Sequence, residues 1–283
     1  MRNFDEMIAR NPNIKTLPTI FTQLSNAISN PLSTIQDVVN IVIKDQTSAS
    51  KLIKVVNSPV YALSTRIDTV SKAIFYLGFN EVKNIILSLS VMKLFENTKV
   101  LDYFNILDLW KHSIAVAVIS RTLAAKIGVT NLENYFVSGL LHDIGKVVLF
   151  NVLGEEYAKL LRQAIDNNLE LKDVEKRELG ITHEIAGEIL SNLWKLPPSI
   201  TRVIRYHSVP GNEQEYNQLV SIVHLADIIA QILNLGNSGR YCIPQPDNTI
   251  WDIISLPKGS MKEIVSEIKL SYSDSLSILK IGK

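Results

Sequence analysis

Apolar residues recur at helical spacing along almost the whole chain. Val82, Ile85, Ile86 and Leu89 follow the i, i+3, i+4, i+7 pattern that places side chains on one face of a helix. Alternation of apolar and polar residues, which is the pattern of a half-buried strand, does not extend over any useful length. The sequence therefore predicts an all-α fold.

Residues typical of helix ends divide this pattern into separate helices. Ser33 stands three positions before Gln36 and predicts a capping box at the start of a helix. Gly78 is expected to close one helix before Glu81 opens the next. Residues 57–61, with the sequence Asn-Ser-Pro-Val-Tyr, predict a turn at the end of another helix.

The distribution of histidine, glycine and proline suggests three segments. At 283 residues the chain is long enough for two modest domains. We expect a first helical unit over residues 1–100 and a second over residues 101–235, which contains all five histidines. Residues 236–283 are rich in glycine and proline. They are expected to wrap around the rest of the chain, with one or two short helices between Lys262 and Leu279.

Charge and cysteine content limit the classes of partner and compartment. The net charge of +1 and the lack of a basic stripe argue against nucleic acid as a partner. Cys242 is the only cysteine, so no intramolecular disulfide is expected and a reducing compartment fits best. No secretory signal begins the sequence, and no apolar run reaches 18 residues, so no membrane span is predicted. We expect a soluble cytoplasmic protein.

The segment 138–146, Ser-Gly-Leu-Leu-His-Asp-Ile-Gly-Lys, carries the strongest chemical signal. His142 and Asp143 offer an imidazole nitrogen and a carboxylate oxygen, which are both good ligands of divalent transition metals. Burying a carboxylate without a partner is costly, so a metal ion, a cation or several hydrogen-bond donors should face it. The alternative is a helix-capping or hydrogen-bonded pair without an ion. Lys146 could hold a phosphate or could instead neutralise an acid.

Two more candidate ligands stand among apolar residues. Asp227 lies in a run that is apolar on nearly every side, so a metal or a salt bridge to Lys146 or an arginine should neutralise it. His112 is predicted to begin a helix and to lie on its apolar face, as a ligand or as a buried histidine bonded to a carbonyl. His224 is expected to support a ligand or to lie at the surface.

His183 and His207 are each ambiguous when taken alone. His183 follows Gly-Ile-Thr at an expected helix start, and His207 follows a helix expected over residues 200–206. A structural role is open for either histidine. Together they could complete a second metal position.

From Leu17 to Leu235 the chain resembles the HDOD domain, a signalling relative of the HD-GYP phosphodiesterases in the HD superfamily of metal-dependent phosphohydrolases. The resemblance rests on Asp45, the 57–61 turn, Ala73-Ile74, Leu77-Gly78, Trp110, residues 139–146 (Gly-Leu-Leu-His-Asp-Ile-Gly-Lys), residues 180–183 (Gly-Ile-Thr-His) and residues 194–197 (Trp-Lys-Leu-Pro). It implies an all-α fold in which an HD-like helical core carries an additional N-terminal helical subdomain.

The resemblance also implies a set of metal ligands. One metal position would use His112, His142, Asp143 and Asp227. His183 and His207 match positions that bind a second metal in related two-metal enzymes. The expected cofactor is a divalent transition metal (iron, manganese, nickel or zinc), as one or two ions. Asp143 and Lys146 would be the catalytic residues.

One departure from the HD-GYP pattern argues against turnover. Residues 208–212, Ser-Val-Pro-Gly-Asn, stand where that pattern has an acidic-histidine element and a Gly-Tyr-Pro signature. We therefore expect a bacterial signal-transduction protein that acts mainly through contacts with an unidentified signalling protein, without catalysis. A phosphorylated small molecule is a candidate ligand. The alternative is a metal-dependent phosphohydrolase acting on a nucleotide or cyclic dinucleotide.

Overall fold

The computed structural model describes residues 2–14, 17, 19–58, 61, 63, 65–96, 105–239, 243–257 and 259–279. Secondary structure in these residues is helical and no strand occurs among them, so the all-α prediction is confirmed. The described residues do not include Pro59 and Val60 of the predicted turn, or Cys242. They also do not include the residues on either side of the predicted boundary after residue 100.

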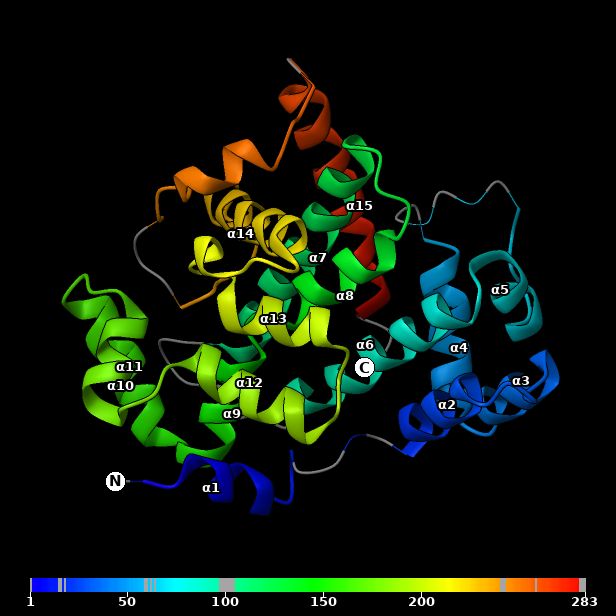
Figure 1. Cartoon of the computed structure of the whole chain (residues 1–283), viewed down its shortest axis with the longest axis horizontal. Coiled ribbons are helices and arrows are strands. Elements are labelled where there is room, and N and C mark those ends of the chain that lie inside the picture. Colours follow the sequence, from blue (N-terminus) through cyan, green and yellow to red (C-terminus); the bar gives the residue numbers. More distant parts are fainter. Residues whose placement is uncertain are drawn as a thin grey trace.

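The first helices gather on one side of the molecule, apart from α1 (Figure 1). Their bounds are α1 Phe4–Arg10, α2 Thr19–Ser29, α3 Ile35–Ile43, α4 Gln46–Val56, α5 Val70–Leu77 and α6 Phe79–Glu96. The helix α6 packs against α2, α4 and α5, and it also contacts α7 (Ile106–Lys126) and α8 (Leu132–Leu141). The helix α1 instead contacts α9 (Ile144–Leu153) and α12 (His183–Leu193), so it lies apart from α2.

Two predicted helix ends are shifted along the chain. The capping box belongs to Thr34 and Asp37 rather than to Ser33 and Gln36. The Thr34 hydroxyl accepts a hydrogen bond from the Asp37 amide at 3.3 Å, and the Asp37 carboxylate accepts one from the Thr34 amide at 2.8 Å. A carboxylate accepts this bond more strongly than a carboxamide, which favours the later register. Gly78 closes α5 with φ of +87°, as predicted, but α6 begins at once, before Glu81.

The helices from α7 to α14 form the rest of the core. Their bounds are α7 Ile106–Lys126, α8 Leu132–Leu141, α9 Ile144–Leu153, α10 Glu155–Asp166, α11 Leu171–Leu179, α12 His183–Leu193, α13 Pro198–Tyr206 and α14 Asn217–Ile232. Every residue of α7 from His112 to Ser120 is buried, and the helix contacts α8, α14 and α15 (Met261–Leu279). The helix α7 therefore forms the centre of the core.

Two glycines allow α9 and α12 to cross at very short distance. A Cβ atom on Gly145 of α9 would lie 1.7 Å from the carbonyl oxygen of His183. A Cβ atom on Gly187 of α12 would lie 3.2 Å from the backbone nitrogen of Gly145 and 2.5 Å from the side chain of Ile204, which follows on the next helix. Any larger residue at Gly145 would push the start of α12 away. The glycine two positions after Asp143 therefore allows His183 to lie close to that carboxylate.

Residues after α14 cover the core. They form the 3₁₀ helix η2 Asn248–Asp252 and the helix α15 Met261–Leu279, while the shorter η1 Pro210–Asn212 precedes α14. The helix α15 packs on α7 and α4, so the segment wraps around the rest of the chain. The predicted interval holds one helix of 19 residues rather than one or two short helices. The predicted division into residues 1–100, 101–235 and 236–283 stays a prediction.

One segment passes a length and composition test for a membrane span. Leu132–Leu153, which includes α8 and α9, is long and apolar enough to cross a membrane, but 78% of its apolar stretch is buried inside the molecule. Burial of this kind is the property of a helix at the centre of a globular core.

Candidate metal centre

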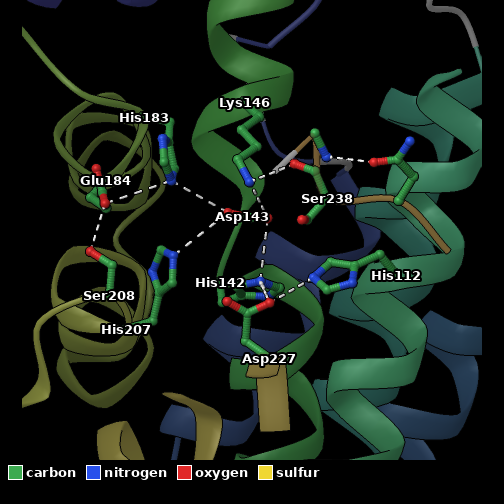
Figure 2. A network of polar contacts seen from close by, with 12 residues as sticks. His112, His142, Asp143, Lys146, His183, Glu184, His207, Ser208, Asp227 and Ser238 are labelled. Carbon is green, nitrogen blue, oxygen red and sulfur yellow. Dashed lines mark hydrogen bonds and ion pairs between the residues drawn. The ribbon is translucent and has the colours of Figure 1, made fainter. Parts of the chain in front are cut away.

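The six predicted ligands meet in one buried cluster, although they come from five parts of the chain (Figure 2). His112 lies on α7, His142 and Asp143 lie between α8 and α9, and Asp227 lies on α14. His183 begins α12 and His207 follows α13. Each of the six is 3% exposed or less. His112 does not begin its helix as predicted: α7 begins at Ile106, where the side chain of Asn105 caps it.

The first half of the cluster joins α7 to α14. The Nε2 atom of His112 lies 2.9 Å from Oδ1 of Asp227. The Nε2 atom of His142 lies 3.9 Å from the same oxygen and 3.4 Å from Oδ2 of Asp143. The ligand atoms of His112, His142 and Asp227 are therefore close enough together to hold one ion. Of the alternatives for Asp227, the structure shows a pair with His112 rather than with Lys146.

The second half of the cluster lies on the other side of Asp143. Its Oδ1 atom is 3.5 Å from Nε2 of His183 and 3.6 Å from Nε2 of His207. Figure 2 shows Asp143 between the two groups of histidines. The two oxygens of Asp143 therefore face different histidines.

Two of the histidines are held by backbone carbonyls through their other ring nitrogen. The Nδ1 atom of His142 lies 2.7 Å from the carbonyl oxygen of Gly139, and that of His207 lies 3.1 Å from the carbonyl oxygen of Ile204. A carbonyl only accepts, so each Nδ1 carries the proton and each Nε2 keeps a free lone pair. This is how proteins orient the imidazoles that bind metals.

Several buried atoms at the centre have no hydrogen-bond partner among the described residues. They are Nε2 of His142, Nε2 of His183, Nε2 of His207, Oδ1 of Asp143 and Oε2 of Glu184. A buried polar atom left without a partner costs about 1–3 kcal/mol. Atoms of this kind turned toward one another fit a divalent metal ion, for which imidazole nitrogen and carboxylate oxygen are suitable donors.

A family model for the HDOD domain matches residues 14–210, which is more than half of the chain. The chain belongs to the HDOD domain family. An uncharacterized protein of Treponema pallidum (strain Nichols) is 26% identical over 223 residues, which are 78% of this chain and 43% of that protein. The chain therefore spans less than half the length of this relative.

Solved structures share the fold of this HDOD protein. An HDOD domain protein of unknown function from Geobacter sulfurreducens has a TM-score of 0.77 at 25% identity, and the match covers 97% of this chain and 94% of that one. A candidate phosphohydrolase from Shewanella amazonensis SB2B has a TM-score of 0.74 at 21% identity, with 96% and 97% of the two chains covered. The all-α HDOD fold is thus shown independently of the cluster.

Glu175 supports the centre of this HDOD domain and was missed by the sequence analysis. Its Oε2 atom accepts a hydrogen bond from the backbone amide of His183 at 2.9 Å and lies 2.7 Å from Nδ1 of that residue. The Tyr157 hydroxyl donates to Oε1 at 2.5 Å. Glu175 stands four residues after Leu171 and four before Leu179, on the apolar face of α11. This position of an acidic residue on an apolar helix face was the signal in the sequence that could have identified Glu175.

Glu184 was also missed. Its Oε1 atom lies 3.7 Å from Nε2 of His183 and accepts a hydrogen bond from the Ser208 hydroxyl at 2.8 Å. The ligand atoms of His142, Asp143 and His207 form a second group close enough together to hold an ion. Glu184 forms a third such group with His183 and His207. Its place directly after a candidate ligand was the only signal in the sequence.

Lys146 of the HDOD domain is buried, and its ammonium group is hydrogen-bonded to two other residues. Its Nζ atom donates to Oδ2 of Asp143 at 2.6 Å and to the carbonyl oxygen of Ser238 at 2.8 Å, and the residue is 1% exposed. The structure therefore shows the alternative in which Lys146 neutralises an acid. Its predicted catalytic role stays a prediction.

His224 supports the centre from behind. Its Nδ1 atom lies 2.7 Å from the carbonyl oxygen of His207, and its Nε2 accepts a hydrogen bond from the Asp247 amide at 3.1 Å. It is 5% exposed, so of the two expectations for His224 the supporting role fits and the surface position does not. Its bonds fix the end of α13, where His207 stands.

Three donors of the cluster, His207, Asp143 and Glu184, are held in the protonation states that a metal requires. Burial, with a contribution from His142, lowers the pKa of His207 to about 3, so its imidazole is neutral at neutral pH. Burial alone would raise the pKa of Asp143, but Lys146 and His142 outweigh it and hold that pKa well below its usual value. Burial would also raise the pKa of Glu184, but His183 and His207 outweigh it and lower that pKa. Neutral imidazoles and ionised carboxylates are the metal-binding forms.

Proposed function

We propose that this HDOD protein is a bacterial, cytoplasmic regulatory protein whose helical core holds one or two divalent transition metal ions, with iron, manganese, nickel and zinc as the candidates. The observation that carries the proposal is the set of buried, unpartnered ligand atoms on His142, Asp143, His183 and His207 among the described residues. Such an ion would supply Lewis acidity and an activated water. The protein's own residues orient the imidazoles and exclude solvent.

Two features support regulation rather than turnover. Lys146 already donates to Asp143 and Ser238, so its ammonium group is not free to meet a phosphate. The early helices and the turns between them also expose large apolar side chains, which suit contact with a protein partner. They are Leu32 (86% exposed), Phe75 (78%), Tyr76 (49%), Ile35 (48%) and Ile43 (48%).

Metal analysis of protein purified without chelator tests the proposal. We expect one or two equivalents of metal in the wild type and a clear loss in His183→Ala/His207→Ala. Leu52→Ala is the control, because it removes a fully buried apolar side chain of α4 without touching the centre. It should lose stability, by about 2–5 kcal/mol, but keep its metal. If none of the four metals copurifies or rebinds to the wild type, the proposal is wrong.

A phosphohydrolase acting on a nucleotide or cyclic dinucleotide is the second candidate. One observation favours it: Glu184, in the third ligand group, also lines a cavity of about 270 Å³ that opens to solvent. A substrate could therefore reach the centre. Assays of nucleotides and cyclic dinucleotides with metal-loaded protein separate the candidates. Turnover that is lost in His142→Ala/Asp143→Ala would favour the enzyme.

A further inference from the structure

A cavity of about 270 Å³ lies beside the candidate metal centre, between α11 and the end of α13. The residues that matter for its chemistry are Lys172, Lys176, Glu184, Arg205 and Ser208. A second cavity of about 380 Å³ also has Lys172 and Ser208 in its wall, so the two adjoin.

The rim of the 270 Å³ cavity carries unpaired positive charge. Lys172 and Lys176 stand one helical turn apart on α11, and neither forms an ion pair in the part of the chain that the structure describes. Arg205 adds a third cation but pairs with Glu188 at 3.1 Å. The exposed Asp173 is the one acid on the rim of this cavity among the described residues.

The inner wall of the same cavity belongs to the metal centre. Glu184 is 4% exposed, and its Oε2 atom has no hydrogen-bond partner among the described residues. The Ser208 hydroxyl donates to the other oxygen of Glu184 and is therefore occupied. An ion held by His183, Glu184 and His207 would thus face the cavity from its inner end.

We propose that this cavity binds a terminal phosphate group. The ammonium groups of Lys172 and Lys176 would lie on one side of the phosphate, and an ion held by His183, Glu184 and His207 on the other. The inference rests on the proposed function, because the carboxylate of Glu184 alone would repel an anion and a bound cation reverses that effect. Lysine is a suitable point charge for phosphate. Lys146 cannot take this role, since it is buried and bonded to Asp143.

Calorimetric titration of the metal-loaded full chain with inorganic phosphate tests the proposal. We expect Lys172→Gln/Lys176→Gln to bind phosphate about tenfold more weakly than the wild type, because two charged contacts are lost. Lys262→Gln/Lys269→Gln, on the exposed face of α15, is the matched control and should bind as the wild type does. Dimethyl phosphate, a diester with a single charge, should bind more weakly than inorganic phosphate.

The metal content of each protein, measured on the same samples, separates two kinds of failure. A wild type without metal overturns the proposed function and this inference with it. Metal-loaded wild type that does not bind phosphate overturns the inference alone. The same holds if phosphate binds equally well to the α11 double variant, if chelation leaves its affinity unchanged, or if the diester binds as tightly.

Discussion

The helices up to α6 and the helices from α7 to α14 bury different kinds of polar side chain. In the described residues up to Val91 the buried polar residues are Ser48, Ser58, Ser88 and Ser90. Between α7 and α14 the buried acidic and basic residues, each 5% exposed or less, are His112, Glu133, His142, Asp143, Lys146, Glu175, His183, Glu184, His207, Glu213, His224 and Asp227. Ionised groups are expensive to bury. The free-energy cost of burying ionisable groups therefore falls on the helices from α7 to α14, where the candidate ligands lie.

The two regions also differ in the apolar side chains that they expose, and here the special feature lies in the earlier region. Among the described residues, the two most exposed large apolar side chains are Leu32 and Phe75, both in the earlier region. Candidate ligands thus gather in the later region, while the earlier region offers the apolar surface that suits a protein partner.

The largest expected effect is the loss of stability when the buried ion pair between Lys146 and Asp143 is broken. Lys146→Met leaves the Asp143 carboxylate without its cation in the metal-free protein, and breaking such a buried pair costs about 3–5 kcal/mol. Denaturant unfolding with chelator present measures this. The cost should shrink when metal is added, because a metal ion takes over the neutralisation of Asp143.

Lys72→Met is the matched control in the earlier region. Lys72 pairs with Asp68 at 2.8 Å, but the two side chains are 50% and 60% exposed. Water screens such a pair, so little change in stability is expected. Equal losses in the two variants would contradict the contrast between the regions.

The sequence predicted the helical class from periodicity. It predicted the six clustered residues from the His-Asp pair, from the apolar surroundings of His112 and Asp227, and, for His183 and His207, from expected helix ends and the family pattern. Helix ends were predicted less well: Thr34 caps α3 where Ser33 was expected, since two neighbouring hydroxyl residues compete for one position. Glu175 was missed because the charged residues around it resemble a solvated helix face. The contact between Lys146 and Ser238 uses a backbone carbonyl 92 residues away, which no side-chain pattern can indicate.

A smaller effect is expected from the residue that orients His183. Glu175→Gln keeps the shape of the side chain but removes the charge that holds Nδ1 of His183, so metal affinity should fall about 10- to 100-fold. Titration against a competing chelator measures the change. Glu178→Gln is the control on the same helix, because Glu178 is exposed and pairs with the neighbouring Arg177. An unchanged affinity in Glu175→Gln would show that Glu175 acts on folding alone.

The smallest effect is the pH dependence of the metal-free protein. A histidine whose pKa is lower in the folded state takes up a proton on unfolding, so its full contribution to stability is present above the ordinary pKa of 6.5 and is lost as the pH falls toward the folded value. Burial gives His207 and His112 this behaviour. His183 partly offsets them: burial would lower its pKa, but Glu175 and Glu184 outweigh burial and raise it.

Stability measured with chelator should therefore fall on acidification, by under about 1 kcal/mol between pH 7 and pH 6. His207→Asn should show a shallower slope, since one of the two responsible imidazoles is gone. Leu52→Ala should be less stable at every pH but should keep the slope of the wild type, because the change lies far from the buried histidines of the later helices. The same slope in His207→Asn and the wild type would mean that the acid sensitivity does not come from the centre, and the contrast between the two regions would then lose its electrostatic basis.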